Sequence, residues 1–305
     1  MRYVVTGAAG FIGSHLAEAL ADRGHGVVGI DSFTDYYDPG LKEENAAHLD
    51  VLRFDLAEDP LDLSGFDGVF HLAAQPGVRS FGDVFRLYVR RNVVATQRVL
   101  EAAAAAGVRV VLASSSSVYG DAERYPTPED ATPRPISPYG ITKLACEHLA
   151  YAYSRGFGAD CVSLRYFTVY GPRQRPDMFF RRAVDLLASG GTFELYGSGA
   201  QSRSFTYVAD AVEATIAAME RAPAGGVYNV GGGDEASMLE AIALLEGIAG
   251  QALDVRRTNP AAGDVARTKA DITKIREALG WEPRTSLEDG LRAQWEWASA
   301  RLSAL

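Results

Sequence analysis

Cysteine is scarce in this sequence and no long apolar run occurs, which excludes several classes of protein. Cys146 and Cys161 are the only two cysteines among 305 residues, too few for a disulfide framework or a cysteine-based metal site. The five histidines are scattered without the spacing of metal ligands, so we expect no bound metal. No stretch is apolar enough to cross a bilayer, and the chain begins in a predicted strand rather than a signal peptide. We therefore expect a cytoplasmic protein that does not insert into membranes.

Positive charge is also in the minority. Lysine and arginine total 30 and aspartate and glutamate 39, which gives a formal net charge of −9 at pH 7. An acidic chain disfavours nucleic acid as a partner, because nucleic-acid binding requires a basic surface. Hydrophobic residues make up 47% of the sequence, enough to bury one large core or two unequal ones. The composition is typical of a soluble globular protein.

The amino terminus has a pattern typical of dinucleotide binding. Residues 3–5 predict a short strand that leads into a glycine-rich turn, and an apolar pattern with the period of a helix follows. In such a turn Gly7 allows a tight reversal, Gly10 lets the backbone approach a pyrophosphate, and Gly13 allows the helix to pack closely on the strand. The N-terminus of the helix then attracts the anion.

Asp31 follows the second predicted strand, residues 27–30, at the distance expected of an acid that binds the ribose. A carboxylate there accepts hydrogen bonds from both ribose hydroxyls and repels a 2′-phosphate, which favours NAD over NADP. The alternative is that Asp31 only caps the loop that follows it.

Tyr139 and Lys143 are four residues apart, a spacing that places both side chains on one face of a helix. A free phenol has a pKa of roughly 10 and is a poor base near neutrality. A lysine charge about 6 Å away favours the phenolate by roughly 2.8 kcal/mol at an effective dielectric constant of about 20. A second positive charge, such as an oxidised nicotinamide ring, would supply the remainder. The pair therefore predicts a bound oxidised dinucleotide.

The sequence upstream strengthens this prediction, because Tyr-x-x-x-Lys alone is common on helix surfaces. Residues 108–112 predict a buried parallel strand, and four consecutive serines, 114–117, follow its carboxyl end. Ligands of open α/β sheets bind at that end of the strands. From Tyr3 to about Tyr166, strand-like runs alternate with helical patterns, which predicts an α/β fold with a doubly wound parallel sheet.

With these motifs the chain resembles the extended short-chain dehydrogenase/reductases, and within them the nucleotide-sugar 4-epimerases, over nearly its whole length. The resemblance implies a Rossmann domain over residues 1–170, to which residues 205–232 return. It implies a smaller mixed α/β substrate domain over residues 171–204 and 233–305. It also implies NAD as cofactor and a homodimer, formed through a helical stretch at residues 83–106 and the helix that starts near Tyr139.

The same resemblance assigns the site residues. Tyr139 would be the base, Lys143 its activator, and Ser115, or its neighbour Ser116, the catalytic serine. The residues that would bind the cofactor are Gly7, Gly10, Phe11, Ile12, Gly13, Asp31, Asp55, Leu56, Leu72, Ala73, Ala74, Gln75, Asn92, Tyr139, Lys143 and Tyr166. The residues that would bind the substrate are Val78, Arg79, Ser115, Ser116, Ser117, Tyr139, Thr168, Arg175, Arg203, Asp264 and Arg267.

The serine run also helps to choose between reactions. Related 4,6-dehydratases and uronate decarboxylases carry an acid in this cluster, and this chain has none. A dehydratase needs a carboxylate pair for its proton transfers, whereas epimerisation at C4 needs one proton shuttle and a hydride acceptor. Residues 165–178 resemble UDP-glucuronic acid 4-epimerases more than the galactose enzymes, which implies that Thr168 and Arg175 lie near the sugar carboxylate. Guanidinium suits that role because it binds carboxylates in a bidentate manner.

We therefore expect NAD-dependent 4-epimerisation of a UDP-sugar, UDP-glucuronate to UDP-galacturonate, through a transient 4-keto intermediate. Three alternatives remain open: a 4-epimerase for UDP-glucose, UDP-galactose or their N-acetyl forms, a UDP-glucuronate decarboxylase, and a regulator that binds NAD without catalysis.

Overall fold

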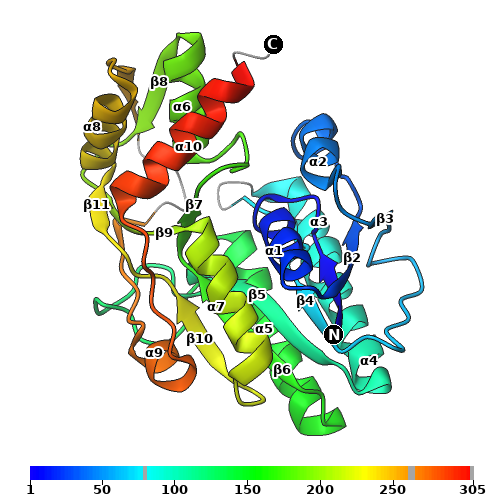
Figure 1. Cartoon of the computed structure of the whole chain (residues 1–305). Helices are drawn as coiled ribbons and strands as arrows, with labels where there is room; N and C mark the ends of the chain where they lie inside the picture. Colours follow the sequence, from blue (N-terminus) through cyan, green and yellow to red (C-terminus); the bar gives the residue numbers. More distant parts are fainter. Residues whose placement is uncertain (78–80, 260–264, 303–305) are drawn as a thin grey trace.

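A seven-stranded parallel sheet forms the larger part of the computed structural model, which describes residues 1–77, 81–259 and 265–302 (Figure 1). In sheet order the strands are β10 (Val227–Val230), β6 (Cys161–Tyr166), β5 (Arg109–Ser115), β4 (Gly68–His71), β1 (Arg2–Thr6), β2 (Gly26–Asp31) and β3 (Val51–Arg53). The predicted doubly wound α/β fold is confirmed.

Helices cover both faces of this sheet because alternate residues of each strand face opposite sides. In β5, Val111 and Ala113 belong to the core beneath α1 (Phe11–Asp22) and α7 (Val208–Arg221). Val110 and Leu112 belong to the core beneath α4 (Ala95–Ala106) and α5 (Pro138–Phe157). The next residue of the strand on this second side is Ser114. A short helix, α2 (Pro39–Ala46), follows β2.

The smaller part contains two further sheets and a third core. β9 (Ser202–Tyr207) pairs with β7 (Thr168–Tyr170), β11 (Glu235–Ser237) and β13 (Arg267–Thr268), and β8 (Thr192–Tyr196) pairs with β12 (Asp254–Thr258). Figure 1 shows α10 (Leu287–Leu302) lying against α6 (Phe179–Ser189) and α8 (Met238–Ala249), and their apolar faces enclose this third core.

The helical stretch predicted at residues 83–106 is present but is not one regular helix. It runs through a 3₁₀ turn, η1 (Gly82–Val84), α3 (Phe85–Tyr88), a π-helical segment, η2 (Val89–Val94), and α4, which ends at Gly107 with φ +68°. A π-helical segment shifts the register of every residue after it, and such segments are frequent at functional sites.

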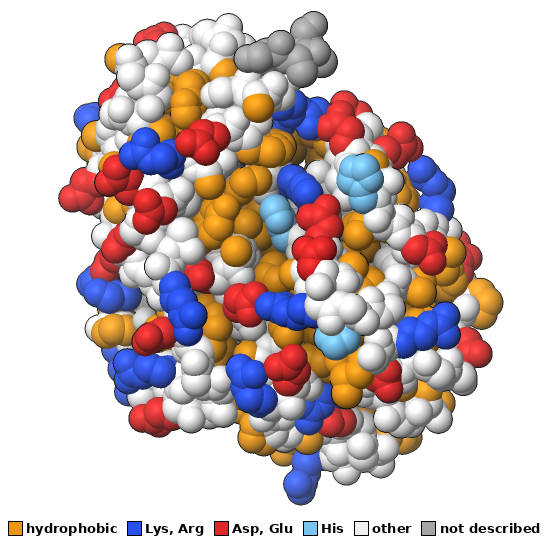
Figure 2. Space-filling model, viewed as in Figure 1, with side chains coloured by type: hydrophobic (Ala, Val, Ile, Leu, Met, Phe, Trp, Pro, Cys, Tyr) orange, Lys and Arg blue, Asp and Glu red, His pale blue; other side chains and the backbone are white. Residues whose placement is uncertain are grey.

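The surface carries both signs of charge. On the face in Figure 2, basic and acidic side chains are interspersed, with hydrophobic side chains between them. Among the described residues, no helix is at once long and apolar enough to cross a membrane.

Candidate active site

A cavity of about 640 Å³ lies at the carboxyl ends of the central strands, bounded on its other side by the smaller part of the molecule. Its walls come from α1, β2, β5 and β6 on one side and from β8, β9 and α8 on the other. Ligands of open α/β sheets bind in this position. Of the residues assigned to the site from sequence, most line this one cavity.

The glycine turn after β1 leaves no room for side chains. Gly7 has φ +73°, and a Cβ there would lie 2.9 Å from the backbone nitrogen of Ala73. A Cβ on Gly13 would lie 2.1 Å from the carbonyl oxygen of Gly7. Gly10 is the N-cap of α1 and brings no side chain to it. The first turn of α1 is therefore open to an anion, as pyrophosphate binding requires. Gly7, Gly10, Phe11, Ile12 and Gly13 all line the cavity.

Asp31 lies at the end of β2 in the cavity wall and also bonds to the backbone. Its carboxylate accepts hydrogen bonds from the backbone nitrogens of Ala9, at 3.2 Å, and Phe33, at 2.8 Å. Burial raises the pKa of Asp31, and the two backbone bonds and the Lys42 charge oppose that rise. The second bond is the loop cap that the sequence left open, so Asp31 caps the loop while it faces the cavity.

The end of β4 is fixed by a neutral histidine. His71 is buried, with Nδ1 2.8 Å from Thr6 Oγ1 and Nε2 3.0 Å from Thr96 Oγ1. Burial, with the charge of Lys143 second, lowers the pKa of His71 to about 3. The imidazole is therefore uncharged and structural near neutral pH. The cavity wall beyond it contains Leu72, Ala73, Ala74 and Gln75, and Asp55 and Leu56 lie in the wall after β3.

Asn92 connects this wall to the helix behind it. Its Oδ1 accepts a hydrogen bond of 2.6 Å from the backbone nitrogen of Gln75, and its Nδ2 donates to Thr142 Oγ1 at 3.0 Å. The side chain is 1% exposed and lies behind the cavity rather than in it. Its position in the π-helical segment η2 thus joins the end of β4 to α5.

Tyr139 and Lys143 lie in the cavity wall on the first two turns of α5, as their spacing predicts. Ser137 is the N-cap and accepts a hydrogen bond from the backbone nitrogen of Gly140, which fixes the start of the helix. Lys143 Nζ donates to the carbonyl oxygen of Ala113 at 2.7 Å and lies 5.8 Å from the centroid of the Tyr139 ring. The ammonium group is therefore held beside the phenol by the backbone of β5.

The serine run divides its members between two sides. Ser114 turns away from the other serines and donates to the carboxylate of Glu147. Ser115 accepts a 3.1 Å bond from the backbone nitrogen of Ser117 and donates to the Ser117 hydroxyl at 3.1 Å. Ser116 begins the 3₁₀ turn η3 (Ser116–Val118), and all four serines contribute to the cavity wall.

Thr168, Tyr166 and Arg175 also line the cavity. The guanidinium group of Arg175 makes two bonds to Asp177, from Nε to Oδ1 at 3.0 Å and from Nη2 to Oδ2 at 3.1 Å. Burial lowers the pKa of Arg175, but Asp177, together with Tyr36 and Tyr139, raises the pKa overall. Arg173, the nearby arginine, instead pairs with Glu18 at 2.9 Å.

Arg203 of β9 lines the cavity on the side of the smaller part of the molecule, where its guanidinium group bonds to the carbonyl oxygens of Ser202 and Val265. Arg267 pairs with Glu235 through two bonds of 2.6 and 2.9 Å and lies outside the cavity lining. Val78, Arg79 and Asp264 are outside the described residues. Within the described residues, no group of three or more histidine, cysteine and acidic side chains could hold a metal ion.

Several residues of the cavity wall have no role among the site residues predicted from sequence: Tyr36, Tyr37, Lys42, Asp177, Arg182 and Tyr196. Lys42 Nζ donates to the carbonyl oxygen of Thr34 at 2.8 Å and lies 4.9 Å from the ring of Tyr37. Burial lowers the pKa of Lys42, while Asp31 opposes this shift. Adjacent tyrosines in the loop after Asp31 were the available signal, whereas Lys42 lies in an ordinary helical pattern.

The chain is similar to known epimerases over its whole length. A profile of the NAD dependent epimerase/dehydratase family matches residues 3–231. An uncharacterized UDP-glucose epimerase of Bacillus subtilis, YtcB, is 41% identical over 315 residues, covering 98% of each chain. The UDP-glucuronate 4-epimerase of Thermodesulfobacterium geofontis is 36% identical, covering 99% of this chain and 98% of the relative. The UDP-glucuronic acid 4-epimerase of Bacillus cereus, solved with UDP-glucuronic acid and NAD, superposes with a TM-score of 0.95 at 41% identity, covering 99% of this chain and 100% of that chain.

Proposed function

Because the chain belongs to the NAD dependent epimerase/dehydratase family, we propose that it is an isomerase that converts UDP-glucuronate into UDP-galacturonate. The observation that carries the proposal is the convergence of Tyr139, Lys143 and the serine run on one cavity whose wall also contains Arg175 and Thr168. A base, a charge to activate it and a guanidinium group for a carboxylate are the parts that this reaction needs.

NAD fits the residues present. Side chains on Gly7 or Gly13 would clash with the backbone of Ala73 or Gly7 and distort the turn that pyrophosphate needs, and the carboxylate of Asp31 disfavours a 2′-phosphate. When bound, NAD accepts a hydride from C4 of the sugar and later returns it. Residues that would hold it include Gly7, Gly10, Phe11, Ile12, Gly13, Asp31, Asp55, Leu56, Leu72, Ala73, Ala74, Gln75, Lys143 and Tyr166, with Asn92 behind them.

Tyr139 takes the proton of the 4-hydroxyl group, directly or through Ser115, as the hydride leaves C4. Lys143, 5.8 Å from the phenol ring, stabilises negative charge on the phenolate. Ser116 and Ser117 lie in the same wall, where their hydroxyl groups would donate hydrogen bonds to the C4 oxygen. The product of this half-reaction is a 4-keto sugar, and Tyr139 then holds the proton.

The 4-keto sugar must rotate in the cavity so that the hydride can return to the opposite face of C4. Arg203, in the wall formed by the smaller part, holds the diphosphate during that rotation, so only the sugar moves. The proton returns from Tyr139 to the C4 oxygen, and no net oxidation occurs.

A glucuronate substrate makes a side reaction possible, because its 4-keto form is a β-keto acid that readily loses carbon dioxide. Arg175 and Thr168 hold the carboxylate and so suppress this loss. The test is Arg175→Ala: we expect slower epimerisation of UDP-glucuronate and release of some UDP-pentose. Intact turnover without a pentose would contradict the carboxylate role.

The reaction itself is tested with purified protein incubated separately with UDP-glucuronate and UDP-glucose, with and without added NAD. Proton NMR of the anomeric and C4 positions identifies the product. Formation of the galacto isomer of UDP-glucuronate supports the proposal, and a UDP-pentose indicates decarboxylation. The absence of product from either sugar would favour the alternative of a regulator that binds NAD without catalysis.

One contact favours a second candidate, the 4-epimerisation of neutral UDP-hexoses. Arg175 is already paired with Asp177, so the charge that a uronate would meet is neutralised. Under this reading UDP-glucose turns over at least as fast as UDP-glucuronate, and Arg175→Ala leaves the UDP-glucose rate unchanged.

We also propose a cytoplasmic homodimer of two-domain subunits. Exposed apolar side chains on α5, Ile141 (48% exposed) and Phe157 (72%), support self-association. Both cysteines are free and buried, as in reducing compartments.

Separate cores support the division of each subunit into two domains at residues 170, 205 and 232. Trp281 packs into the large core, where its Nε1 donates to the carbonyl oxygen of Asp210. We therefore place α9 (Thr273–Leu279) and Trp281 with the larger domain, although the sequence assigned residues 233–305 to the smaller one.

A further inference from the structure

Three polar residues lie side by side across the carboxyl ends of neighbouring strands. Ser114 of β5 pairs in register with Arg165 of β6, which pairs with Asn229 of β10. Paired residues of a sheet point to the same face. Val110 and Leu112 of β5 share that face and pack beneath α5. A polar row therefore replaces the apolar core at this end of the sheet, directly beneath the helix that carries Tyr139.

The row is completed by an ion pair with the helix. Arg165 donates to Glu147 of α5 through two parallel bonds, from Nε to Oε1 at 2.9 Å and from Nη2 to Oε2 at 2.7 Å. Each of the two side chains is 7% exposed. Ser114 donates to Oε1 of the same carboxylate. The two-pronged contact fixes the plane of the carboxylate, and with it the hydroxyl of Ser114.

Glu147 follows Lys143 by four residues, as Lys143 follows Tyr139, so the three side chains share one face of α5. Two of them bond to successive residues of β5. Lys143 donates to the carbonyl oxygen of Ala113, and Glu147 accepts from the side chain of Ser114. The helix that carries the base is thereby pinned along β5, and Ser115 is the next residue of the strand.

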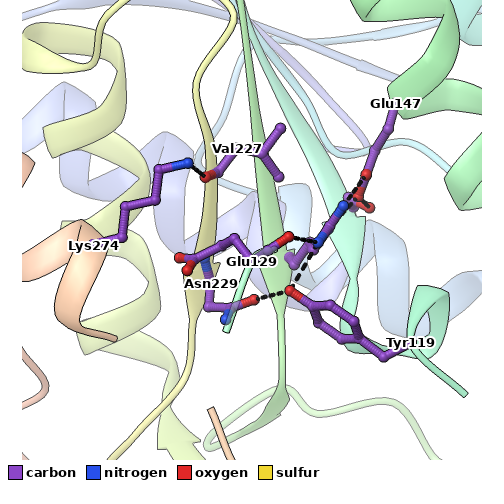
Figure 3. Close-up of polar contacts among 8 residues, drawn as sticks. Tyr119, Glu129, Glu147, Val227, Asn229 and Lys274 are labelled. Atoms are coloured by element: carbon purple, nitrogen blue, oxygen red, sulfur yellow. Dashed lines mark hydrogen bonds and ion pairs between the residues drawn. The ribbon is translucent and has the colours of Figure 1, made fainter. Parts of the chain in front are cut away.

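The same cluster holds the loop that precedes α5. Arg165 Nη1 donates to the Tyr119 hydroxyl at 2.8 Å and to the carbonyl oxygen of Glu129 at 3.1 Å. Burial raises the pKa of Tyr119 to about 12, so the phenol keeps its proton and donates to Asn229 Oδ1 at 2.7 Å. Asn229 in turn donates to the carboxylate of Glu129 from its backbone nitrogen and to the carbonyl oxygen of Thr127 from Nδ2. Figure 3 shows Glu147 and Glu129 approaching this cluster from opposite sides, with Tyr119 and Asn229 pointing toward each other.

We propose that Glu147 and Arg165 are positioning residues for the reaction: they fix α5 and its preceding loop against the end of β5, so that Tyr139 and Ser115 meet the sugar in register. The inference rests on the proposed function. Proton and hydride transfer are steeply sensitive to distance, and a misplacement of about 1 Å can slow a reaction about 100-fold.

Stability alone gives little reason for charges in this place. Removing two charges from water offsets much of their attraction, and apolar residues of similar size often stabilise a protein equally well. What a bidentate charged contact adds is a fixed direction. That direction matters here because the residues on either side of the cluster carry the proposed chemistry.

The sharpest test is Ser114→Ala, which removes the link between the ion pair and β5 but leaves Glu147 and Arg165 paired. We expect kcat to fall about tenfold or more while KM for the UDP-sugar stays within about twofold, because alignment rather than binding is lost. NAD content and melting temperature should stay close to those of the wild type. With substrate deuterated at C4, the isotope effect on kcat should rise, since hydride transfer becomes slower.

A second variant and a matched control keep the result interpretable. Glu147→Gln keeps the size of the side chain but leaves Arg165 without its counter-ion, so both kcat and melting temperature should fall. Asp160→Asn breaks the 2.7 Å ion pair with Arg109 at the opposite end of the same two strands. It should change stability alone and leave kcat and the isotope effect as in the wild type.

A Ser114→Ala enzyme with wild-type kcat and isotope effect would overturn the positioning role, even if Glu147→Gln were unstable. So would equal losses of kcat in Glu147→Gln and Asp160→Asn. If the wild type turned over neither UDP-glucuronate nor UDP-glucose, the proposed function would fail, and the positioning role would fall with it.

Discussion

Gly13 lies so close to Gly7 that a Cβ on Gly13 would stand 2.1 Å from the carbonyl oxygen of Gly7. No side-chain rotation relieves such a clash, because the backbone fixes the position of a Cβ and the carbonyl oxygen of Gly7 is itself backbone. The first turn of α1 can stay in place against the end of β1 only with a glycine at this position.

Gly13→Ala should therefore displace α1 and abolish NAD binding, with a lowered melting temperature. Calorimetric titration with NAD and thermal unfolding measure the two effects. Gly247→Ala is the matched control, because Gly247 is also inside a helix and a Cβ there meets nothing within 4 Å. That control should bind NAD normally and gain up to about 1 kcal/mol of stability, the usual difference between alanine and glycine in a helix. Retained NAD affinity in Gly13→Ala would show that the turn does not carry the pyrophosphate.

Tyr139→Phe should lower kcat by about 10²–10⁴, the usual contribution of a general acid–base group, and leave NAD bound. Removing the hydroxyl takes away the proton acceptor without changing the fold of α5. Initial rates and the NAD content of the purified protein check this. Tyr151→Phe, on the same helix but 63% exposed, is the control and should keep the wild-type rate. A loss of less than about tenfold in Tyr139→Phe would assign the base elsewhere.

Asp31→Asn should narrow the preference for NAD over NADP. The substitution removes the negative charge that repels a 2′-phosphate, and it keeps an oxygen that can accept from the backbone nitrogen of Phe33. NAD affinity should fall about tenfold, the effect of weakening a hydrogen bond to a charged group, while NADP affinity rises. Dissociation constants for both cofactors are the measurement. An unchanged ratio would mean that Asp31 serves the loop alone.

Acid should destabilise the protein through His71. Burial, with Lys143 second, lowers the folded pKa of His71 from 6.5 to about 3. The unfolded chain therefore binds a proton below pH 6.5, whereas the folded chain does not bind it until about pH 3. The free energy of unfolding decreases as the pH is lowered through that window. This group contributes up to about 1.4 kcal/mol for each pH unit.

Denaturant unfolding at a series of pH values checks this slope. His71→Gln should be less stable at pH 7 but lose stability less steeply on acidification. His148→Gln, at an exposed position of α5, should keep the wild-type slope. Equal slopes in the wild type and His71→Gln would show that His71 is not the group responsible.

Local patterns in the sequence were enough to predict those parts of the fold in which residue types repeat with the period of a helix or a strand. The glycine turn, the strand before the serine run and the pairing of Tyr139 with Lys143 all depend on neighbours within a few residues. The ring-to-ammonium separation of 5.8 Å agrees with the distance assumed from helical spacing. The predicted strand, helix and strand order around the turn is also present.

Local patterns could not predict contacts that depend on how one helix or strand lies against another in the folded protein. Arg165 was noticed only as the start of a family motif, because its partner Glu147 depends on how α5 lies on the sheet. The π-helical segment η2 has no distinct signature in composition, so the sequence predicts only one helical stretch over residues 83–106. Arg175 was expected to face a substrate carboxylate, yet Asp177 two residues later was not considered as its partner.

The four consecutive serines look interchangeable in the sequence, but they are not. Ser114 and Ser115 face opposite sides of β5: the Ser114 hydroxyl donates to Glu147, and the Ser115 hydroxyl accepts from the backbone nitrogen of Ser117. Deleting or inserting one residue in this strand would turn each serine to the opposite face of β5, while a run of serines would remain in the sequence. Such a homologue would keep a run of serines in its sequence, yet the residue facing Glu147 and the residue facing the cavity would both have changed.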